Sequence, residues 1–151
     1  MIAINLAIGL LLMMLCLVLQ VTFTFWSVRY SLRPLAEEPS GDGPWSGIRV
    51  LLIAMTVMML GNFIQIMLWG ALFLWLAEFS EFYEAVYHSA VNFTSLGYGD
   101  VVMSKERKLL GPLESLNGIV MLGMSGAALL AILQHLIKTQ RPAGGEPAKF
   151  R

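Results

Sequence analysis

Three long runs without a charged residue constrain this chain most. They cover residues 1–28, 50–77 and 115–137, and are therefore 28, 28 and 23 residues long. A helix of about 20 apolar residues crosses a hydrocarbon core about 30 Å thick. A charge at the centre of that core costs about 2.5–3.5 kcal/mol, so uncharged runs mark the segments that cross it. The sequence therefore predicts three transmembrane helices.

The composition excludes the main alternatives to a membrane protein. Hydrophobic residues make up 57% of the chain and charged residues only 13%, whereas soluble domains carry about 25% charged residues. The net charge is zero, which predicts no nucleic-acid partner. The single cysteine, Cys16, excludes an intramolecular disulfide. The sequence contains no catalytic triad, phosphate-binding glycine loop or metal-ligand cluster, so we expect no enzyme, no cofactor and no small-molecule substrate.

The first uncharged run has two interpretations, a retained helix and a cleaved signal peptide. It has no basic residues at its amino end, and its apolar stretch far exceeds the 7–15 residues of a signal peptide. We therefore predict that residues 1–30 form a retained N-terminal transmembrane helix. Residues 31–47 contain several prolines and glycines, which predicts a cytoplasmic linker. Residues 139–151 are predicted to be a disordered cytoplasmic tail.

The basic residues predict the orientation of the chain. If the linker and the tail lie in the cytoplasm, seven basic residues lie inside and three outside, which agrees with the positive-inside rule. The acidic residues divide the other way, so the outer face carries 3 − 6 = −3 and the inner face 7 − 4 = +3. The acidic residues assigned to the outside are Glu78, Glu81, Glu84, Asp100, Glu106 and Glu114. We expect a multi-pass protein of the cell membrane with its N-terminus outside and its C-terminus in the cytoplasm.

A fourth uncharged run, residues 85–99, is too short to cross a bilayer. Residues 83–94 could form a helix about 18 Å long at 1.5 Å per residue. The chain then reaches Gly97, Tyr98 and Gly99, which disfavour a continued helix. The charged residues that follow, from Asp100 to Lys108, must return to the surface from which the helix entered. The run therefore predicts a re-entrant loop, with a short helix going in and extended backbone coming out.

Extended backbone at membrane depth survives only when protein buries it or when it lines a water-filled path. Three helices cannot surround such a loop, so it implies an oligomer whose copies meet around a shared axis. Glycines at alternate positions allow left-handed dihedral angles without a Cβ penalty. Alternating handedness can turn successive carbonyl oxygens to one side, where they replace the hydration shell of a monovalent cation.

The residues of this loop resemble the selectivity filter of the potassium channel family, usually written Thr-Val-Gly-Tyr-Gly-Asp. The matching residues are Thr94, Ser95, Leu96, Gly97, Tyr98, Gly99 and Asp100. The resemblance implies an ion-channel pore module at residues 48–138, with an outer helix at 48–78, a pore helix at 83–94, the filter at 95–100 and an inner helix at 113–138. It also implies a homotetramer in the membrane lipid. The permeant ion would be K+, held by the backbone of Ser95, Leu96, Gly97 and Tyr98.

The residues that match the family's filter motif differ from it at several positions. Ser95 stands at the filter threonine and Leu96 at the valine, while Thr94 and Asp100 flank the filter, Asp100 at the outer mouth. Serine keeps the hydroxyl of threonine but lacks the methyl group that restrains its rotamer. Tyr87 and His88 occupy the place where many family members have paired tryptophans that brace the filter tyrosine.

Two alternatives to a potassium-selective channel remain open. Ser95 and Leu96 suggest a poorly selective monovalent cation channel. The extra first helix suggests a non-conducting membrane subunit that packs against a partner. Against this last alternative stands the intact Gly97-Tyr98-Gly99 motif, which has no other evident purpose.

Other residues in the predicted membrane segments have interpretations that compete. Gly123 matches the inner-helix glycine that serves as a gating hinge in the family, although close helix packing is the favoured explanation. For His88, a structural hydrogen bond is favoured over a pH sensor. Asn62 and Gln65 are predicted to form hydrogen bonds between helices.

Overall fold

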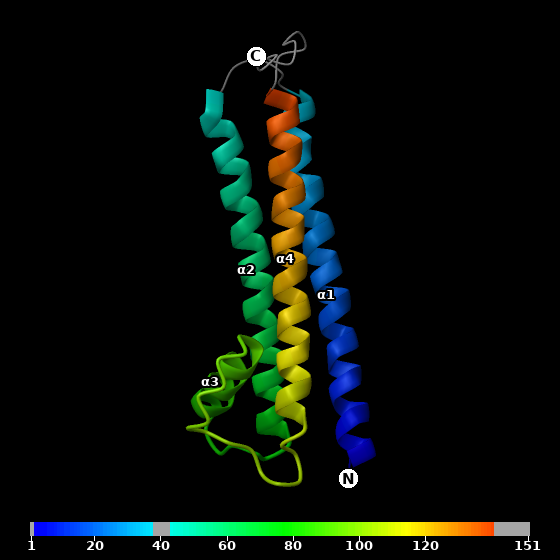
Figure 1. Cartoon of the computed structure of the whole chain (residues 1–151), viewed down its shortest axis with the longest axis vertical. Coiled ribbons are helices and arrows are strands. Elements are labelled where there is room, and N and C mark those ends of the chain that lie inside the picture. The colour runs from blue at the N-terminus through cyan, green and yellow to red at the C-terminus, as the bar shows by residue number, and fades with distance from the viewer. Residues whose placement is uncertain (1, 38–42, 141–151) are drawn as a thin grey trace, which may run out of the picture.

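The computed structural model describes residues 2–37 and 43–140, and all regular structure within them is helical. The helices are α1 (Ile2–Glu37), α2 (Gly43–Trp75), α3 (Phe82–Phe93) and α4 (Leu110–Gln140). Three of them are long and run nearly parallel to one axis, whereas the short helix α3 lies obliquely at one end (Figure 1). The predicted all-α fold class is confirmed.

The three long helices are sufficiently long and apolar to cross a membrane. Their apolar segments are Ile2–Tyr30, Gly47–Trp75 and Leu110–Lys138, each 29 residues long. They coincide with the three predicted spans, so the protein is an integral membrane protein. α2 runs antiparallel to α1 and α4, as three successive crossings require (Figure 1).

The helix bounds differ from the predicted ones mainly between the first two spans. α1 continues to Glu37, past the predicted end at residue 30, and α2 begins at Gly43 instead of residue 48. Pro34 therefore lies inside α1, where its missing N–H removes one hydrogen bond. That loss falls about one turn before the helix ends, so it does not stop the helix. The centre of the predicted linker, 38–42, and the predicted tail from 141 onward lie outside the described residues.

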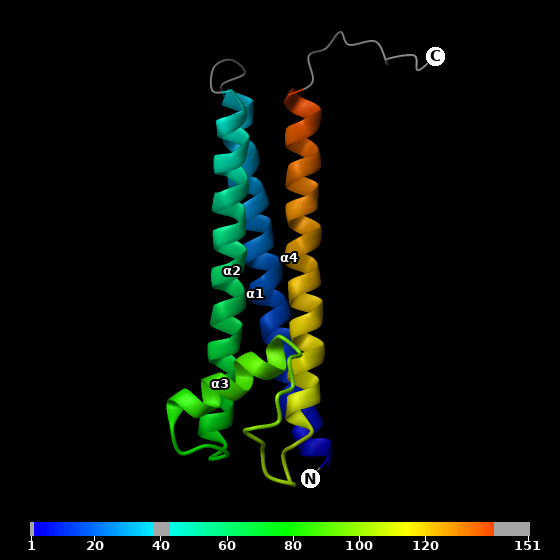
Figure 2. The same cartoon turned by 60° about the vertical axis from the view of Figure 1, so that its left-hand side comes forward.

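The two ends of the bundle differ in what they hold. The start of α1 lies at the same end as α3, whereas the end of α1, the start of α2 and the end of α4 lie at the other end (Figures 1 and 2). The start of the chain and the re-entrant loop therefore share one side of the membrane.

α2 and α4 form a central pair that is covered on two sides. α1 packs on both of them, and α3 also packs on both of them, while α1 and α3 do not pack on each other. Figure 2 shows α3 and the loop after it on the side of the pair that faces away from α1. α1 therefore supports, from behind, the two helices that hold α3.

Apolar clusters fill the two ends of the bundle. Near α3, Trp69, Phe73 and Leu110 are completely buried together with Cys16 of α1. Toward the other end, α2 and α4 meet through a second cluster of buried side chains: Val50, Ala54, Met58, Ala128, Ile132 and Leu136. The side chains of this second cluster recur every four residues on each helix, a spacing that places them on one face of each helix.

A mid-membrane polar cluster, made of Gln20, Asn62, Gln65 and Ser125, lies between these apolar clusters. The Gln20 amide nitrogen donates to the Ser125 hydroxyl at 2.8 Å, and the Gln65 amide nitrogen donates to the Gln20 amide oxygen at 2.7 Å. The Asn62 amide also reaches the Ser125 hydroxyl, at 3.4 Å. The predicted interhelical bonds of Asn62 and Gln65 are confirmed, and they join all three spanning helices.

Candidate functional site: the re-entrant loop

The backbone of α3 lies directly against α2 and α4 because a glycine faces it from each helix. A Cβ added to Gly70 of α2 would lie 3.1 Å from the Cα of Val86. A Cβ added to Gly118 of α4 would overlap the carbonyl oxygen of Phe93, at the last residue of α3. Gly118 therefore permits close packing of α4 against α3. The two glycines fix the depth and direction of the short helix.

α3 ends in a hydrogen-bonded cap at the point where the filter segment, residues 95–99, begins. The Leu96 N–H donates to the Val91 carbonyl at 3.0 Å, and the Ser95 N–H donates to the Asn92 carbonyl at 2.8 Å. Ser95 itself has a φ of 60°. These are the bonds and the left-handed residue of a Schellman motif, a position that glycine usually occupies. The sequence did not predict this role for Ser95.

The backbone of the filter segment alternates in handedness. Ser95, Gly97 and Gly99 have positive φ angles of 60°, 61° and 73°, whereas the intervening Leu96 and Tyr98 have negative φ. The left-handed angles expected at the two glycines are present. Left-handed backbone costs L-residues roughly 1–2 kcal/mol but is open to glycine. Such alternation is what turns successive carbonyl groups toward one side of an extended chain.

A single chain leaves the filter segment uncovered. Residues 94–100 are all exposed, including Leu96 at 58% and Tyr98 at 67%. A Cβ added to Gly97 or Gly99 would meet no atom of this chain within 4 Å. The glycines are therefore required by their backbone angles and not by crowding within the chain.

Two neighbouring side chains of α3 fix the outward end of the filter segment. The Tyr87 hydroxyl donates to a carboxylate oxygen of Asp100 at 2.6 Å, and the other oxygen accepts from the Val101 N–H at 3.0 Å. The bond from Tyr87 lowers the pKa of Asp100, and the same bond raises the pKa of Tyr87 to about 12. Asp100 is therefore ionised and Tyr87 protonated at neutral pH.

His88 holds the next residue of the loop. Its Nδ1 lies 2.9 Å from the Val101 carbonyl, and its Nε2 lies 2.9 Å from the Asn92 amide nitrogen. Because a carbonyl only accepts, Nδ1–H is the donor and Nε2 accepts from Asn92. The predicted structural hydrogen bond of His88 is confirmed. Within the chain, Tyr87 and His88 thus bond to Asp100 and Val101, not to the filter tyrosine. Burial lowers the pKa of His88 and favours its neutral form.

Glu78 anchors the loop between the filter and α4. One of its carboxylate oxygens accepts from the Ser104 N–H at 2.8 Å and the other from the Ser104 hydroxyl at 2.9 Å. Arg107 also approaches the carboxylate, at 3.4 Å. Among the acidic residues assigned to the outside, Glu78 therefore serves the loop structure, whereas Glu81, Glu84 and Asp100 are exposed.

Glu114 is the main functional candidate that the sequence reasoning misplaced. It was counted among the charges of the outer face, but its side chain is completely buried inside the chain. The Ser89 hydroxyl of α3 lies 2.5 Å from its carboxyl group and 2.8 Å from the carbonyl of Ile66 in α2. These contacts join α2, α3 and α4 behind the filter. The only signal in the sequence was the position of Glu114 immediately before an uncharged run.

The candidate hinge Gly123 lies on a free face of α4. A Cβ added to Gly123, or to Gly126 nearby, would meet nothing within 4 Å. Both positions are exposed, so the packing favoured for Gly123 is not present within this chain. Its role as a gating hinge stays a prediction.

Comparison with known families agrees with this geometry. Residues 62–135 match the model of a protein family described as ion channel. The match runs from α2 through α3 and the filter segment into α4, and α1 lies outside it. This match to an ion-channel domain supports the resemblance of the segment to potassium channels. No curated protein and no solved structure matched the chain.

Proposed function

We propose that four copies of this chain form a potassium-selective channel that passes K+ passively down its electrochemical gradient. The observation that carries the proposal is the alternating backbone of residues 95–99 at the end of a re-entrant helix. In the proposed pore, the carbonyl oxygens of Ser95, Leu96, Gly97 and Tyr98 replace the hydration shell of the ion. The C-terminal end of α3, the negative end of its dipole, favours a cation at the inner end of the filter.

The exposure of the filter segment supports a tetrameric assembly. Polar backbone at membrane depth needs protein or water around it, and one chain supplies neither on this side. Further copies around a shared axis would cover Leu96 and Tyr98 and bring four sets of carbonyl groups together. No cofactor is needed, since K+ itself is the bound species.

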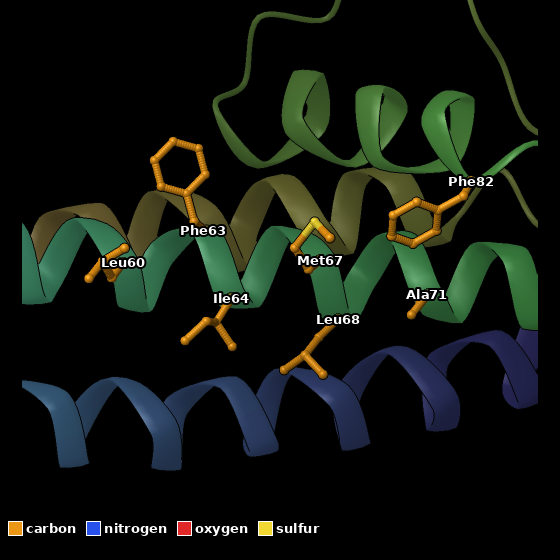
Figure 3. Close-up of a pocket in the computed structure, with 7 residues that line it drawn as sticks. All are labelled: Leu60, Phe63, Ile64, Met67, Leu68, Ala71 and Phe82. Carbon is orange, nitrogen blue, oxygen red and sulfur yellow. The ribbon is translucent and has the colours of Figure 1, made fainter.

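An apolar groove on α2 supports contact with membrane lipid. It has a volume of about 420 Å3 and is lined by six residues of α2, from Leu60 to Ala71, and by Phe82 of α3. Figure 3 shows Phe63 on the side of α2 that faces α3, Phe82 extending from α3 over α2, and Ile64 and Leu68 pointing to the side of α1. None of the lining side chains is charged, as a surface against hydrocarbon requires.

The proposed orientation places the start of α1 and the filter mouth outside the cell. The positive-inside rule supports this choice, because the end of α1, the start of α2 and the end of α4 share the opposite end of the bundle (Figure 1), and these segments contain Arg29, Arg49 and Lys138. Exposed Glu81, Glu84 and Asp100 would then concentrate cations at the outer entrance.

A poorly selective monovalent cation channel is the second candidate. It is favoured by Ser95, whose backbone angle belongs to the cap of α3 as well as to the filter. If the cap sets the direction of the Ser95 carbonyl, the innermost ion site differs from that of a threonine filter.

An ion-substitution assay with purified protein in liposomes separates these candidates. The selective channel passes K+ and Rb+ far better than Na+, and Ba2+ blocks it. A reversal potential that does not move when K+ is exchanged for Na+ would contradict selectivity and support the second candidate. Absence of flux for every ion, from protein that is correctly assembled, would support a non-conducting subunit.

A further inference from the structure

Buried polar side chains from all four helices meet behind the filter. This four-helix junction consists of Cys16 of α1, Trp69 of α2, Ser89 of α3, and Glu114 and Asn117 of α4. Each of these five side chains has 0% of its surface exposed. The thiol of Cys16 lies beside both Trp69 and Asn117, and Glu114 is close enough to act on it electrostatically. The five residues therefore form one local group.

Several polar atoms of the junction have no nitrogen or oxygen partner in the chain, and the neighbour that Trp69 and Asn117 share is the weakly hydrogen-bonding thiol of Cys16. The atoms without such a partner are Nε1 of Trp69, Oε2 of Glu114, and both Nδ2 and Oδ1 of Asn117. A buried polar group without a partner costs about 1–3 kcal/mol in proteins. Four such atoms in one place, inside a membrane-embedded bundle, point to a ligand that supplies the missing bonds.

The chemistry of the four atoms selects the ligand. Trp69 Nε1 and Asn117 Nδ2 only donate hydrogen bonds, whereas Glu114 Oε2 and Asn117 Oδ1 supply acceptors. A bare cation needs acceptors alone, and the described residues contain no group of three or more metal-ligating side chains. An anion would lie beside the carboxyl group of Glu114. Water both donates and accepts, and a buried water typically makes about three hydrogen bonds.

We propose that the four-helix junction is a binding site for ordered water, coordinated by Trp69, Glu114 and Asn117. The water accepts from the indole N–H and the Asn117 amide and donates to the carboxyl group of Glu114. Since Glu114 contacts Ser89, the water extends a chain of polar contacts from α1 and α2 to the pore helix. This site lies behind α3 and is separate from the filter, so the inference is independent of ion selectivity.

Further unpartnered polar atoms lie along α2 toward the mid-membrane polar cluster. Gln65 and Asn62 lie one and two turns from Trp69, and the amide oxygen of each also lacks a partner. The amide nitrogens of the same residues are bonded within the protein.

Magnetisation transfer from water to the indole N–H of Trp69 tests this site in the assembled channel. The measurement uses solid-state NMR on the full chain in deuterated lipid, labelled with 15N-tryptophan, and the Trp69→Phe variant assigns the signal. The other tryptophans, Trp26, Trp45 and Trp75, are at least 67% exposed in the chain and serve as references. We expect rapid transfer to the buried indole of Trp69. Absence of transfer in the wild-type channel would overturn the proposal, because the Trp69 N–H would then be bonded within the chain, to the thiol of Cys16.

A variant of Asn117 tests whether the water is bound at the four-helix junction. Asn117→Leu keeps a similar volume but removes two of the ligating atoms, so we expect transfer to Trp69 to fall by about fivefold or more. Met121→Leu, one turn away at a buried apolar position of α4, is the matched control and should leave transfer unchanged. Equal transfer in both variants would contradict the proposed ligands. If Asn117→Leu does not assemble, the wild-type measurement still decides whether water is bound.

Discussion

The filter segment and the mid-membrane polar cluster differ in how they accommodate polar groups inside the membrane. Both place polar groups at membrane depth. In the mid-membrane polar cluster, Gln20, Gln65 and Ser125 are buried and bond to one another across three helices. In the filter segment, residues 95–99 are exposed, and three of them, Ser95, Gly97 and Gly99, have positive φ angles that glycine accepts most easily.

This difference distinguishes the polar groups that find their partners within one chain from those that need further copies of the chain. In the scaffold of α1, α2 and α4, the side chains of Gln20, Gln65 and Ser125 bond to one another across helices of the same chain. The filter segment presents its carbonyl groups and aromatic side chain to a space that this chain does not fill. A substitution in the filter segment should therefore stop ion flux without unfolding the chain, and one in the polar cluster should do the reverse.

The largest expected effect is that of Gly97→Ala. The new Cβ meets nothing within 4 Å in the chain, but the residue has a φ of 61°. Left-handed alanine costs roughly 1–2 kcal/mol per copy, or about 4–8 kcal/mol for a tetramer. We expect Rb+ flux into liposomes to fall by more than about 100-fold while size-exclusion chromatography shows an intact assembly.

The matched control for Gly97→Ala is Gly126→Ala. Gly126 is equally open to a Cβ but lies in the helix α4. This variant should fold at least as well as the wild type, because alanine favours a helix. Near-normal flux through Gly97→Ala would remove the support for the filter assignment.

Next in size is Gly118→Ala, which acts on the position of the pore helix. Its Cβ would overlap the Phe93 carbonyl, so α3 must move away from α4. Overpacking of this kind typically costs about 1–3 kcal/mol. We expect both a lower thermal stability and a flux reduced by about tenfold or more, measured by thermal unfolding and Rb+ uptake. If the unfolding temperature and the Rb+ flux of Gly118→Ala both equal those of Gly126→Ala, the filter tolerates displacement of α3.

A smaller effect, confined to stability, is expected of Gln20→Leu. The variant leaves the Gln65 amide without an acceptor and frees Ser125 from α1. Hydrogen bonds between helices in membranes contribute about 1–2 kcal/mol at most. The detergent-solubilised protein should therefore unfold at a lower temperature but keep its ion selectivity. Thr22→Val is the control, because Thr22 is exposed and bonds only to Val18 of its own helix. Equal unfolding temperatures for the two variants would argue against the structural role of the cluster.

The smallest expected effect is a pH dependence that comes from His88. Burial lowers its pKa from the usual 6.5, so below that pH an unfolded chain binds a proton that the folded chain still excludes. The stability that neutral His88 provides is present above pH 6.5 and is lost as the pH falls through the lowered pKa. Nearby Asp100 and Glu78 oppose the shift but do not reverse it.

Thermal unfolding between pH 7.5 and 5 checks this dependence. We expect His88→Gln to flatten the decline at acid pH, whereas His135→Gln, near the far end of α4, should preserve it. A decline of the same slope in both variants would show that another group is responsible.

The sequence predicts the parts of this fold that depend on local composition. The lengths of the uncharged runs predict three spans and one short helix, and the structure places that helix at Phe82–Phe93, against a predicted 83–94. The glycines of the motif predict the positive φ angles at 97 and 99. These features follow from residues close together in the chain, so no knowledge of packing is needed.

Features that depend on distant contacts were not predictable. The burial of Glu114 depends on Ser89, 25 residues away, and Gln20 bonds to Ser125, 105 residues away. The positive φ of Ser95 follows from the cap of α3, which sequence spacing alone does not reveal. The path of α1 through Pro34 likewise contradicts local propensity. In each case tertiary structure determined the outcome.

The position of bound ions tests the central claim most directly. Crystals of the channel grown with Rb+ would reveal the ions by their anomalous scattering. The account predicts peaks in single file on a fourfold axis, each surrounded by backbone oxygens of residues 95–99 from four chains. Peaks elsewhere, or a segment 95–99 that folds away from any symmetry axis, would contradict it.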